Sequence, residues 1–298
     1  MKGRERQRTL NRDLSFVGVG LHSGAYCEVT LKPAEADTGV VFHRSDLDID
    51  NPFITASPMN VVAADHGTSL ANEAGAQIAT VEHLMAALAL CGVDNVLVEV
   101  NGPEIPILDG SSREFVSGLS SAGCAEQDAV REPYFIHHPI RIGDDDRFIE
   151  FSPGPRRLKL EIEFNDCLIG RQSLSLDLDN LGDLEQLASA RTFCRIGEVE
   201  HLREAGLIRG GTLANSVVVD GDRVLNEDPL RNPQEFALHK ALDLIGDLYL
   251  LGAPVRGSIH AVRPGHFLNT RAARAVLRRA QGETGAAATV RESLQATA

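Results

Sequence analysis

The segment 232–251, NPQEFALHKALDLIGDLYLL, carries the clearest helix signal in the chain. Asn232 is suited to cap the helix, Pro233 to occupy its first position and Glu235 its third, and Gly252 follows its last turn. One side of the helix would carry the apolar stripe Leu238, Leu242, Ile245 and Leu248. We therefore expect a long helix here with a buried side.

Three polar residues of this helix, His239, Asp243 and Asp247, follow one another at steps of four. Four residues advance an α-helix by about 400°, so the three side chains share one broad face. His239 and Asp243 could therefore offer an imidazole nitrogen and a carboxylate oxygen to one metal ion. On spacing alone, the commoner explanation is an exposed helix in which a His/Asp pair only supports the helix.

A second predicted helix runs from Thr80, as its cap, to about Leu90. Glu82 and His83 lie in its first turn, where the helix dipole disfavours a charged imidazole and leaves it able to bind a metal. Glu82 could accept a proton from metal-bound water. The alternative is that Glu82 only complements the dipole and that His83 is an ordinary surface residue.

The sequence Arg263-Pro-Gly-His266 is typical of a loop, where catalytic groups are often displayed. Two histidines and one aspartate with an open fourth position form the ligand set of a catalytic zinc hydrolase. A glutamate base and a further histidine acid, Glu82 and His266, would complete the set. Chain order alone does not show that these residues converge.

The remaining strands and helices are grouped without a strict β-α-β alternation, which favours an α+β fold. Another helix is expected from Ser111, where SSRE (111–114) matches a capping box. The polar stretch 126–133 predicts a boundary between an N-terminal domain, 1–126, and a C-terminal domain, 133–280, with a flexible tail at 281–298. Strands are expected at 27–31, 40–43, 95–100, 134–137, 147–151 and 158–164, with a hairpin turn at 220–222.

Composition excludes several classes of protein. Among 298 residues, 29 Lys+Arg stand against 42 Asp+Glu, so the net charge is −13, and a general nucleic-acid binder needs a basic face instead. The longest nearly apolar run, 84–93, is far shorter than the ~20 residues of a membrane helix. The five cysteines are dispersed and never spaced C-x-x-C, which indicates reduced thiols in a cytoplasmic protein.

Seven stretches of the chain form one further pattern. They are GVGLHSG (18–24), TVEHLMAAL (80–88), PEIPILDGSS (103–112), ARTF (190–193), NED (226–228), HKALDLIGDL (239–248) and GH (265–266). Together they resemble the UDP-3-O-acyl-N-acetylglucosamine deacetylases, zinc enzymes that commit bacteria to lipid A synthesis, and they cover the chain from about Thr9 to Leu277 in the family's order and spacing.

The resemblance implies two layered sheet-plus-helices domains of similar topology, with the active site between them. It assigns the metal ligands to His83, His239 and Asp243, which the spacing had already offered. It further makes Glu82 the general base and His266 the second acid/base group. Asp247 would orient that histidine, and the hydroxyl of Thr192 would help to hold the oxyanion.

The resemblance also implies a substrate site. Lys240, Arg147 and Arg263 would lie near a nucleotide diphosphate, Phe164 would pack on uracil, and Phe193 would line the pocket wall. The insert 196–213, with Ile196, Val199 and Ile208, would form an apolar passage for the acyl chain. Two positions depart from the family: Arg147 replaces a familiar lysine, and Gly67 stands where one member has a cysteine near a second, inhibitory metal.

The expected cofactor is Zn²⁺, with Fe²⁺ as the alternative because nitrogen and oxygen ligands accept both. The expected partner is a UDP-linked acyl-sugar, bound by a cytoplasmic monomer that does not bind nucleic acid. No amphipathic anchor is evident, so contact with the inner membrane would be transient. The alternatives are a metal amidohydrolase of another acylated sugar and a non-catalytic nucleotide-sugar binding protein.

Overall fold

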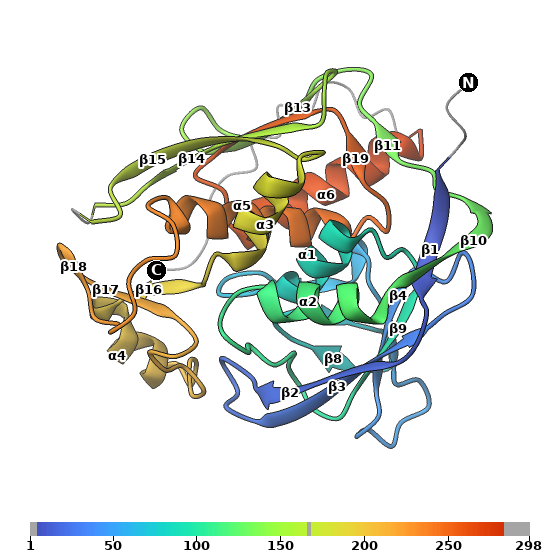
Figure 1. Ribbon diagram of the computed structural model, residues 1–298, viewed down its shortest axis with the longest axis horizontal. Coiled ribbons are helices and arrows are strands. Elements are labelled where there is room, and N and C mark those ends of the chain that lie inside the picture. The colour runs from blue at the N-terminus through green and yellow to red at the C-terminus, as the bar shows by residue number, and fades with distance from the viewer. Residues whose placement is uncertain (1–4, 166–167, 283–298) are drawn as a thin grey trace.

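A computed structural model describes residues 5–165 and 168–282 of the chain, which form two halves with sheets outside and helices inside (Figure 1). In Figure 1 the sheet of the C-terminal half lies along the top and that of the N-terminal half along the bottom. The helices of both halves meet between the two sheets. Residues where these helices meet, such as His83 and Asp243, are buried.

In the N-terminal half the described helical segments are η1 (Pro58–Asn60, a 3-10 turn), α1 (Glu82–Cys91) and α2 (Arg113–Ala122). Its strands are β1 (Arg6–Leu10), β2 (Leu14–Val19), β3 (Tyr26–Pro33), β4 (Val40–Arg44), β5 (Phe53–Thr55), β6 (Val61–Ala63), β7 (Ser69–Ala71), β8 (Gln77–Ile78), β9 (Val96–Val100) and β10 (Cys124–Val130).

In the C-terminal half the helices are α3 (Leu181–Ser189), α4 (Ile196–Glu204), α5 (Glu235–Tyr249) and α6 (His266–Ala280). Its strands are β11 (Tyr134–Phe135), β12 (Ile140–Gly143), β13 (Phe148–Ser152), β14 (Arg157–Glu163), β15 (Arg171–Asp177), β16 (Phe193–Arg195), β17 (Val217–Asp220), β18 (Arg223–Val224), β19 (Val255–Arg256) and β20 (Ser258–Val262).

The two halves repeat one topology. The main sheets have the orders β2-β3-β9-β4-β5 and β12-β13-β20-β14-β15, each antiparallel except for one central parallel pair, β9 with β4 and β20 with β14. The helices also correspond. In the chain, α1 precedes and α2 follows β9, just as α5 precedes and α6 follows β20. The α+β prediction with two similar domains is confirmed.

Each main sheet buries one face, as its alternating sequence dictates. In β3 the residues Cys27, Val29 and Leu31 are buried while their neighbours are half-buried or exposed, and the buried set packs on the apolar side chains of α1. The same holds for Leu158 and Leu160 of β14 against α5. Two apolar cores result, one in each half.

The helices α1 and α5 cross in close contact between the cores. A Cβ atom on Gly246 would lie 2.0 Å from the carbonyl oxygen of Glu82, so no side chain fits at that point of α5. Almost every residue of α5 is buried, including His239, Asp243 and Asp247. The explanation of these residues as part of an exposed helix is therefore wrong.

All three helices begin one or two residues later than predicted. The Thr80 hydroxyl donates to Glu104 (2.7 Å), and α1 begins at Glu82 without a side-chain cap. The Ser111 hydroxyl donates to Asp109 (2.7 Å), and α2 begins at Arg113. The same displacement occurs in α5, which begins at Glu235 after a separate turn at Asn232.

The structure also differs from the prediction at the domain boundary and at His266. Residues 126–130, part of the stretch in which the domain boundary is expected, belong to strand β10, which pairs with β1. His266, expected in a loop, is the first residue of α6. The predicted tail lies outside the described residues from position 283 onward. No helix in 5–165 or 168–282 is long and apolar enough to cross a membrane.

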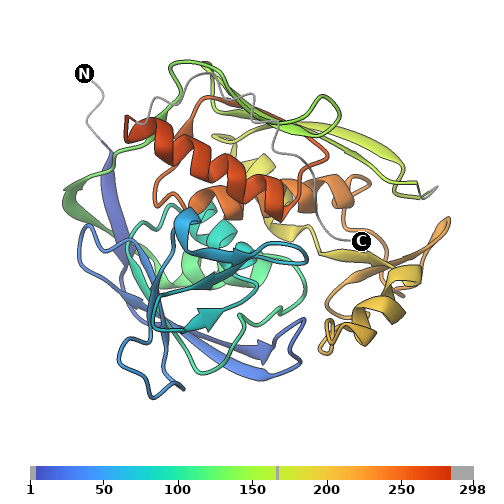
Figure 2. The same cartoon turned by 180° about the vertical axis from the view of Figure 1, so that it is seen from behind.

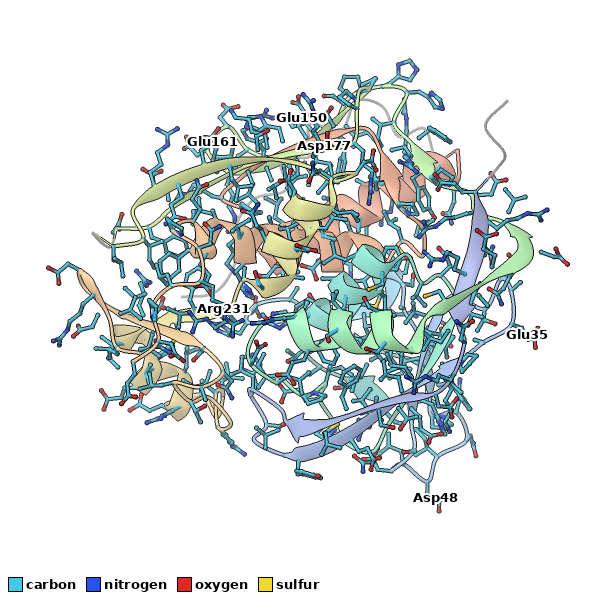
Figure 3. The ribbon with its side chains drawn as sticks, in the orientation of Figure 1. Glu35, Asp48, Glu150, Glu161, Asp177 and Arg231 are labelled. Carbon is cyan, nitrogen blue, oxygen red and sulfur yellow. The ribbon has the colours of Figure 1, made fainter. Side chains whose placement is uncertain are left out.

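The acidic charge is spread over the periphery of the protein, as the labelled carboxylates Glu35, Asp48 and Glu150 illustrate (Figure 3). Arg231, also labelled, bridges the two halves, with its guanidinium 2.9 Å from the carboxylate of Asp109. This contact ties the segment before α5 to the segment before α2.

Candidate active site

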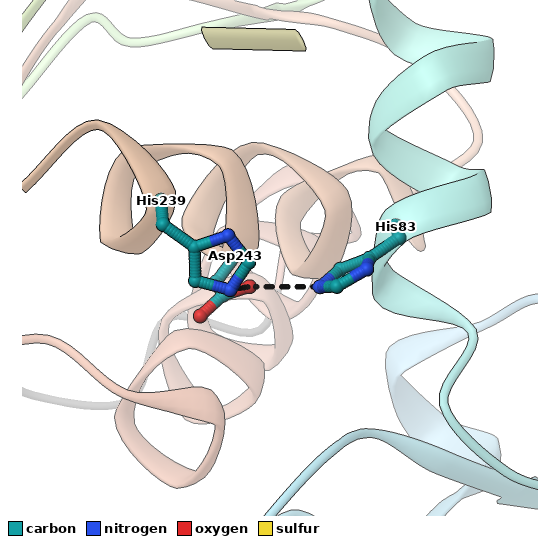
Figure 4. A group of neighbouring side chains, drawn as sticks. All are labelled: His83, His239 and Asp243. Carbon is teal, nitrogen blue, oxygen red and sulfur yellow. Dashed lines mark ion pairs between the residues drawn. The ribbon is translucent and has the colours of Figure 1, made fainter. Parts of the chain in front are cut away.

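Three metal-binding side chains converge where α1 meets α5. His83 reaches from the first turn of α1 toward His239 and Asp243, which lie one turn apart on α5 (Figure 4). One potential ligand atom from each lies within 4.8 Å of the others, and all three residues are buried. Residues 156 positions apart in the sequence thus meet because equivalent helices of the two halves pack together.

The nitrogen and oxygen atoms of these side chains are arranged more suitably for binding one metal ion than for hydrogen bonding to one another. Asp243 Oδ1 lies 3.3 Å from His239 Nε2 and 3.6 Å from His83 Nε2. This buried oxygen accepts no hydrogen bond from the described residues, a costly condition unless a cation satisfies it. His239 Nδ1 lies 3.1 Å from the Ala190 carbonyl oxygen, which directs the other ring nitrogen toward the cluster.

The protonation states also suit metal binding. Burial lowers the pKa of His239 to about 3, so its imidazole is neutral and its Nε2 lone pair is available. Burial opposes ionisation of Asp243, but the neighbouring His239 imidazole and the cations Lys240 and His266 outweigh it and hold the carboxyl pKa well below its usual range. Lys240 Nζ lies 2.9 Å from Asp243 Oδ2 and fixes the carboxylate.

Glu82 and His266 flank the three candidate ligands His83, His239 and Asp243. His266 Nε2 lies 3.9 Å from Glu82 Oε1 and 3.8 Å from Asp243 Oδ2. Burial raises the pKa of Glu82 above its ordinary value. Burial opposes a charged His266, yet the carboxylates of Asp247, Asp243 and Glu82 raise its pKa to about 9. A carboxyl group and an imidazolium therefore face the same small space.

Two residues that the sequence analysis did not single out hold this pair in place. The backbone N–H of Thr68 donates to Glu82 Oε2 (2.9 Å), and its hydroxyl donates to Asp247 Oδ1 (2.5 Å). Asn269 Nδ2 donates to Asp247 Oδ2 (2.9 Å), the oxygen that also lies 2.9 Å from His266 Nδ1. Asn269 could have been found one turn after His266, but nothing in the sequence near Thr68 indicates its role.

The four residues expected around the nucleotide line one pocket of about 180 Å³. Arg147 Nε donates to the Arg263 carbonyl oxygen (3.0 Å), so the two cationic side chains start from the same edge of the pocket. Lys240 lines this pocket and also contacts Asp243. The lining residues are Arg147, Ile162, Glu163, Phe164, Lys240, Arg263 and Pro264.

Phe193 lies beside His239, and Thr192 precedes it in the chain. The Phe193 ring centroid is 6.2 Å from that of His239 and 5.6 Å from that of Phe164, so Phe193 lies between the metal ligands and the pocket. The Thr192 N–H donates to the Gly110 carbonyl oxygen of the other half (2.7 Å).

The insert 196–213 stands apart from both cores. Ile196 begins α4 with 43% of its surface exposed, Val199 follows on the same helix, and Ile208 has a left-handed backbone (φ 49°) in the loop beyond. None of these three side chains belongs to either apolar core of the described chain. Backbone bonds from Arg209 to His22 and from Gly210 to Leu21 join the insert to the N-terminal half.

Comparison with known proteins shows to which family the chain belongs. The family model of UDP-3-O-acyl N-acetylglycosamine deacetylases matches residues 7–278. A UDP-3-O-acyl-N-acetylglucosamine deacetylase of Phenylobacterium zucineum (strain HLK1) is 46% identical over 274 residues, 92% of this chain and 94% of the relative. A protein of the same name from Vibrio vulnificus (strain YJ016) is 43% identical over 277 residues, 91% of this chain and 90% of the relative. The chain therefore belongs to the UDP-3-O-acyl N-acetylglycosamine deacetylase family.

Proposed function

We propose that this chain hydrolyses the N-acetyl group of UDP-3-O-acyl-N-acetylglucosamine, giving acetate and the free amine, the committed step of lipid A synthesis. The observation that carries the proposal is the convergence of His83, His239 and Asp243 beside the pair formed by Glu82 and His266. The names of the relatives supply the substrate. We further propose that this acidic protein acts as a monomer in the cytoplasm.

His83, His239 and Asp243 would hold the metal, for which we propose Zn²⁺ and keep Fe²⁺ as the alternative. Such an ion supplies Lewis acidity, which activates water and polarises the amide carbonyl. The orphaned Asp243 Oδ1 and the neutral His239 support this ligand set.

Glu82 would act as the general base. Its Oε2 is occupied by the Thr68 N–H, while Oε1 faces His266 and can accept the proton of the attacking water. His266, as the imidazolium, would stabilise the negative oxygen that develops on the carbonyl, together with the Thr192 hydroxyl. When the C–N bond breaks, the amine nitrogen takes a proton from His266 or from Glu82. Asp247 would keep His266 charged and oriented.

Substrate recognition would use the pocket and the insert. Arg147, Lys240 and Arg263 would bind the diphosphate as a local basic group within an acidic protein, and Phe164 would pack on uracil. Phe193 would line the wall between diphosphate and metal. The apolar side chains of the insert, among them the exposed Ile196 and the half-buried Val199 and Ile208, would cover the acyl chain.

One assay separates this function from its alternatives. Acetate release from UDP-3-O-acyl-N-acetylglucosamine is measured with the purified protein, with and without a chelator. We expect chelator-sensitive release that returns when Zn²⁺ is added. Release only from another acylated sugar would indicate a different amidohydrolase, and binding without release would indicate a non-catalytic protein.

A further inference from the structure

One face of helix α6 carries cations that no described carboxylate neutralises. The helix contains four arginines, no acidic residue and an exposed Phe267 next to His266. Phe267, Arg271, Arg274 and Arg278 follow at steps of four, three and four, so they form one stripe along the helix. Within the described chain, none of these arginines forms an ion pair, although the protein has 13 more acidic than basic residues.

The stripe is crowded with like charge. Burial and the neighbouring charge of Arg278 lower the pKa of the Arg274 guanidinium. Arg271 lies over the Phe267 ring at 5.4 Å, so its charge also remains on this face. Cations held close together without counter-ions favour the approach of an anionic surface.

Apolar side chains border the stripe. Arg274 donates to the carbonyl oxygens of Pro58 (2.7 Å) and Val61 (2.9 Å), which fixes η1 and β6 alongside α6. Met59 and Val62 in these segments expose 55% and 58% of their surface, and Phe267 exposes 54%. Figure 2 shows α6 in red across this face, with the blue η1–β8 region directly below it. We name the surface formed by Met59, Val62, Phe267, Arg271 and Arg278 the α6 patch.

We propose that the α6 patch binds the surface of an anionic lipid bilayer, the arginines contacting lipid phosphates and the three apolar side chains entering the interface. A nucleic acid would also attract the arginines, but exposed Met, Val and Phe side chains gain little from a phosphate backbone, whereas they gain from burial among acyl chains. The chain would then have an amphipathic membrane contact that its sequence did not reveal. The inference concerns a surface outside the ligand cluster and stands whichever acyl-sugar the enzyme uses.

Vesicle sedimentation of the full chain tests the proposal, with phosphatidylcholine vesicles prepared with and without phosphatidylglycerol. We expect binding only to the anionic vesicles, and release at high salt because the contact is electrostatic. In Arg271→Gln/Arg278→Gln the vesicle affinity should fall roughly fivefold for each arginine removed. In Met59→Ser/Val62→Ser it should fall as well, with the salt dependence retained.

The matched control is Arg12→Gln/Arg113→Gln, which removes the same charge from the exposed surface around α2, on the face seen in Figure 1. This control should bind vesicles like the wild type. Equal losses in both double variants, equal binding to neutral vesicles, or a single-stranded RNA that binds the α6 patch as tightly as the anionic vesicles do would each overturn the proposal. Circular dichroism and the rate on dispersed substrate, expected unchanged in every variant, exclude misfolding as the cause.

Discussion

His266 Nδ1 lies 2.9 Å from Asp247 Oδ2 in a buried pair that the N-terminal half closes through Thr68. The carboxylate comes from α5 and the imidazole from the first residue of α6. Since burial alone would lower the pKa of His266, its rise to about 9 depends on the surrounding carboxylates, of which Asp247 contributes most.

Replacing Asp247 by Asn should shift the basic limb of the kcat/KM–pH profile to lower pH. In the proposed mechanism His266 acts in its protonated form, so the rate should fall as the pH rises through its pKa, and removing the Asp247 charge lowers that pKa. The profile is measured from acetate release. An unshifted basic limb, with Asp145→Asn as the exposed control, would contradict the coupling.

Glu82→Gln should retain metal but lose about two to four orders of magnitude in kcat, because a positioned base contributes about that much. The amide keeps the acceptor for the Thr68 N–H, so the loop before β7 should stay in place. Metal content by atomic emission and kcat are measured on the same sample. A variant that works at nearly the wild-type rate would remove Glu82 from the mechanism.

Asp243→Asn should abolish stabilisation by added Zn²⁺. A metal that binds only the folded chain adds about 2.7 kcal/mol when its free concentration is 100 times Kd, which raises Tm by several degrees. Thermal unfolding of the apo-protein is followed with and without Zn²⁺. The wild type should respond, and Asp243→Asn should not. Asp183→Asn, on the surface helix α3, should respond like the wild type.

Neutralising the pocket cations should act mainly on substrate affinity. Arg147→Gln and Arg263→Gln should raise KM by about tenfold or more, since hydrogen bonds to charged groups contribute roughly 1.5–3 kcal/mol. Lys240→Gln should also lower kcat because Lys240 fixes Asp243. Lys32→Gln, which breaks an ion pair with Glu99 in the other half, serves as the control. Unchanged KM in all three pocket variants would place the diphosphate elsewhere.

Glu235→Gln should destabilise the fold by about 3–5 kcal/mol, because it leaves the buried Arg191 charge uncompensated. Both carboxylate oxygens of Glu235 accept hydrogen bonds from Arg191, at 2.8 and 3.2 Å, and Glu235 is fully buried. Urea unfolding measures the free energy of unfolding. Arg223→Gln, which breaks an exposed pair with Asp220, should leave the midpoint unchanged. A small effect of Glu235→Gln would mean that water reaches Arg191.

The sequence could predict the parts of the site that depend on local periodicity. The i, i+4 spacing of His239 and Asp243 required only a helix, and the helix formed. The start of α1 was misplaced because the Thr80 hydroxyl bonds to Glu104, 24 residues away, a long-range choice that capping preferences do not contain. Thr68 could not be found for the same reason, since its partners lie 14 and 179 residues away.

The missing side chain of Gly246 has a consequence for the order of folding. Because it lets α5 touch the backbone of Glu82, the three ligands form one chelate only after both halves have folded and docked. Either half alone offers at most the His239–Asp243 pair, a weak binder. An ion bound to all three residues would therefore contact both docked halves and stabilise their contact.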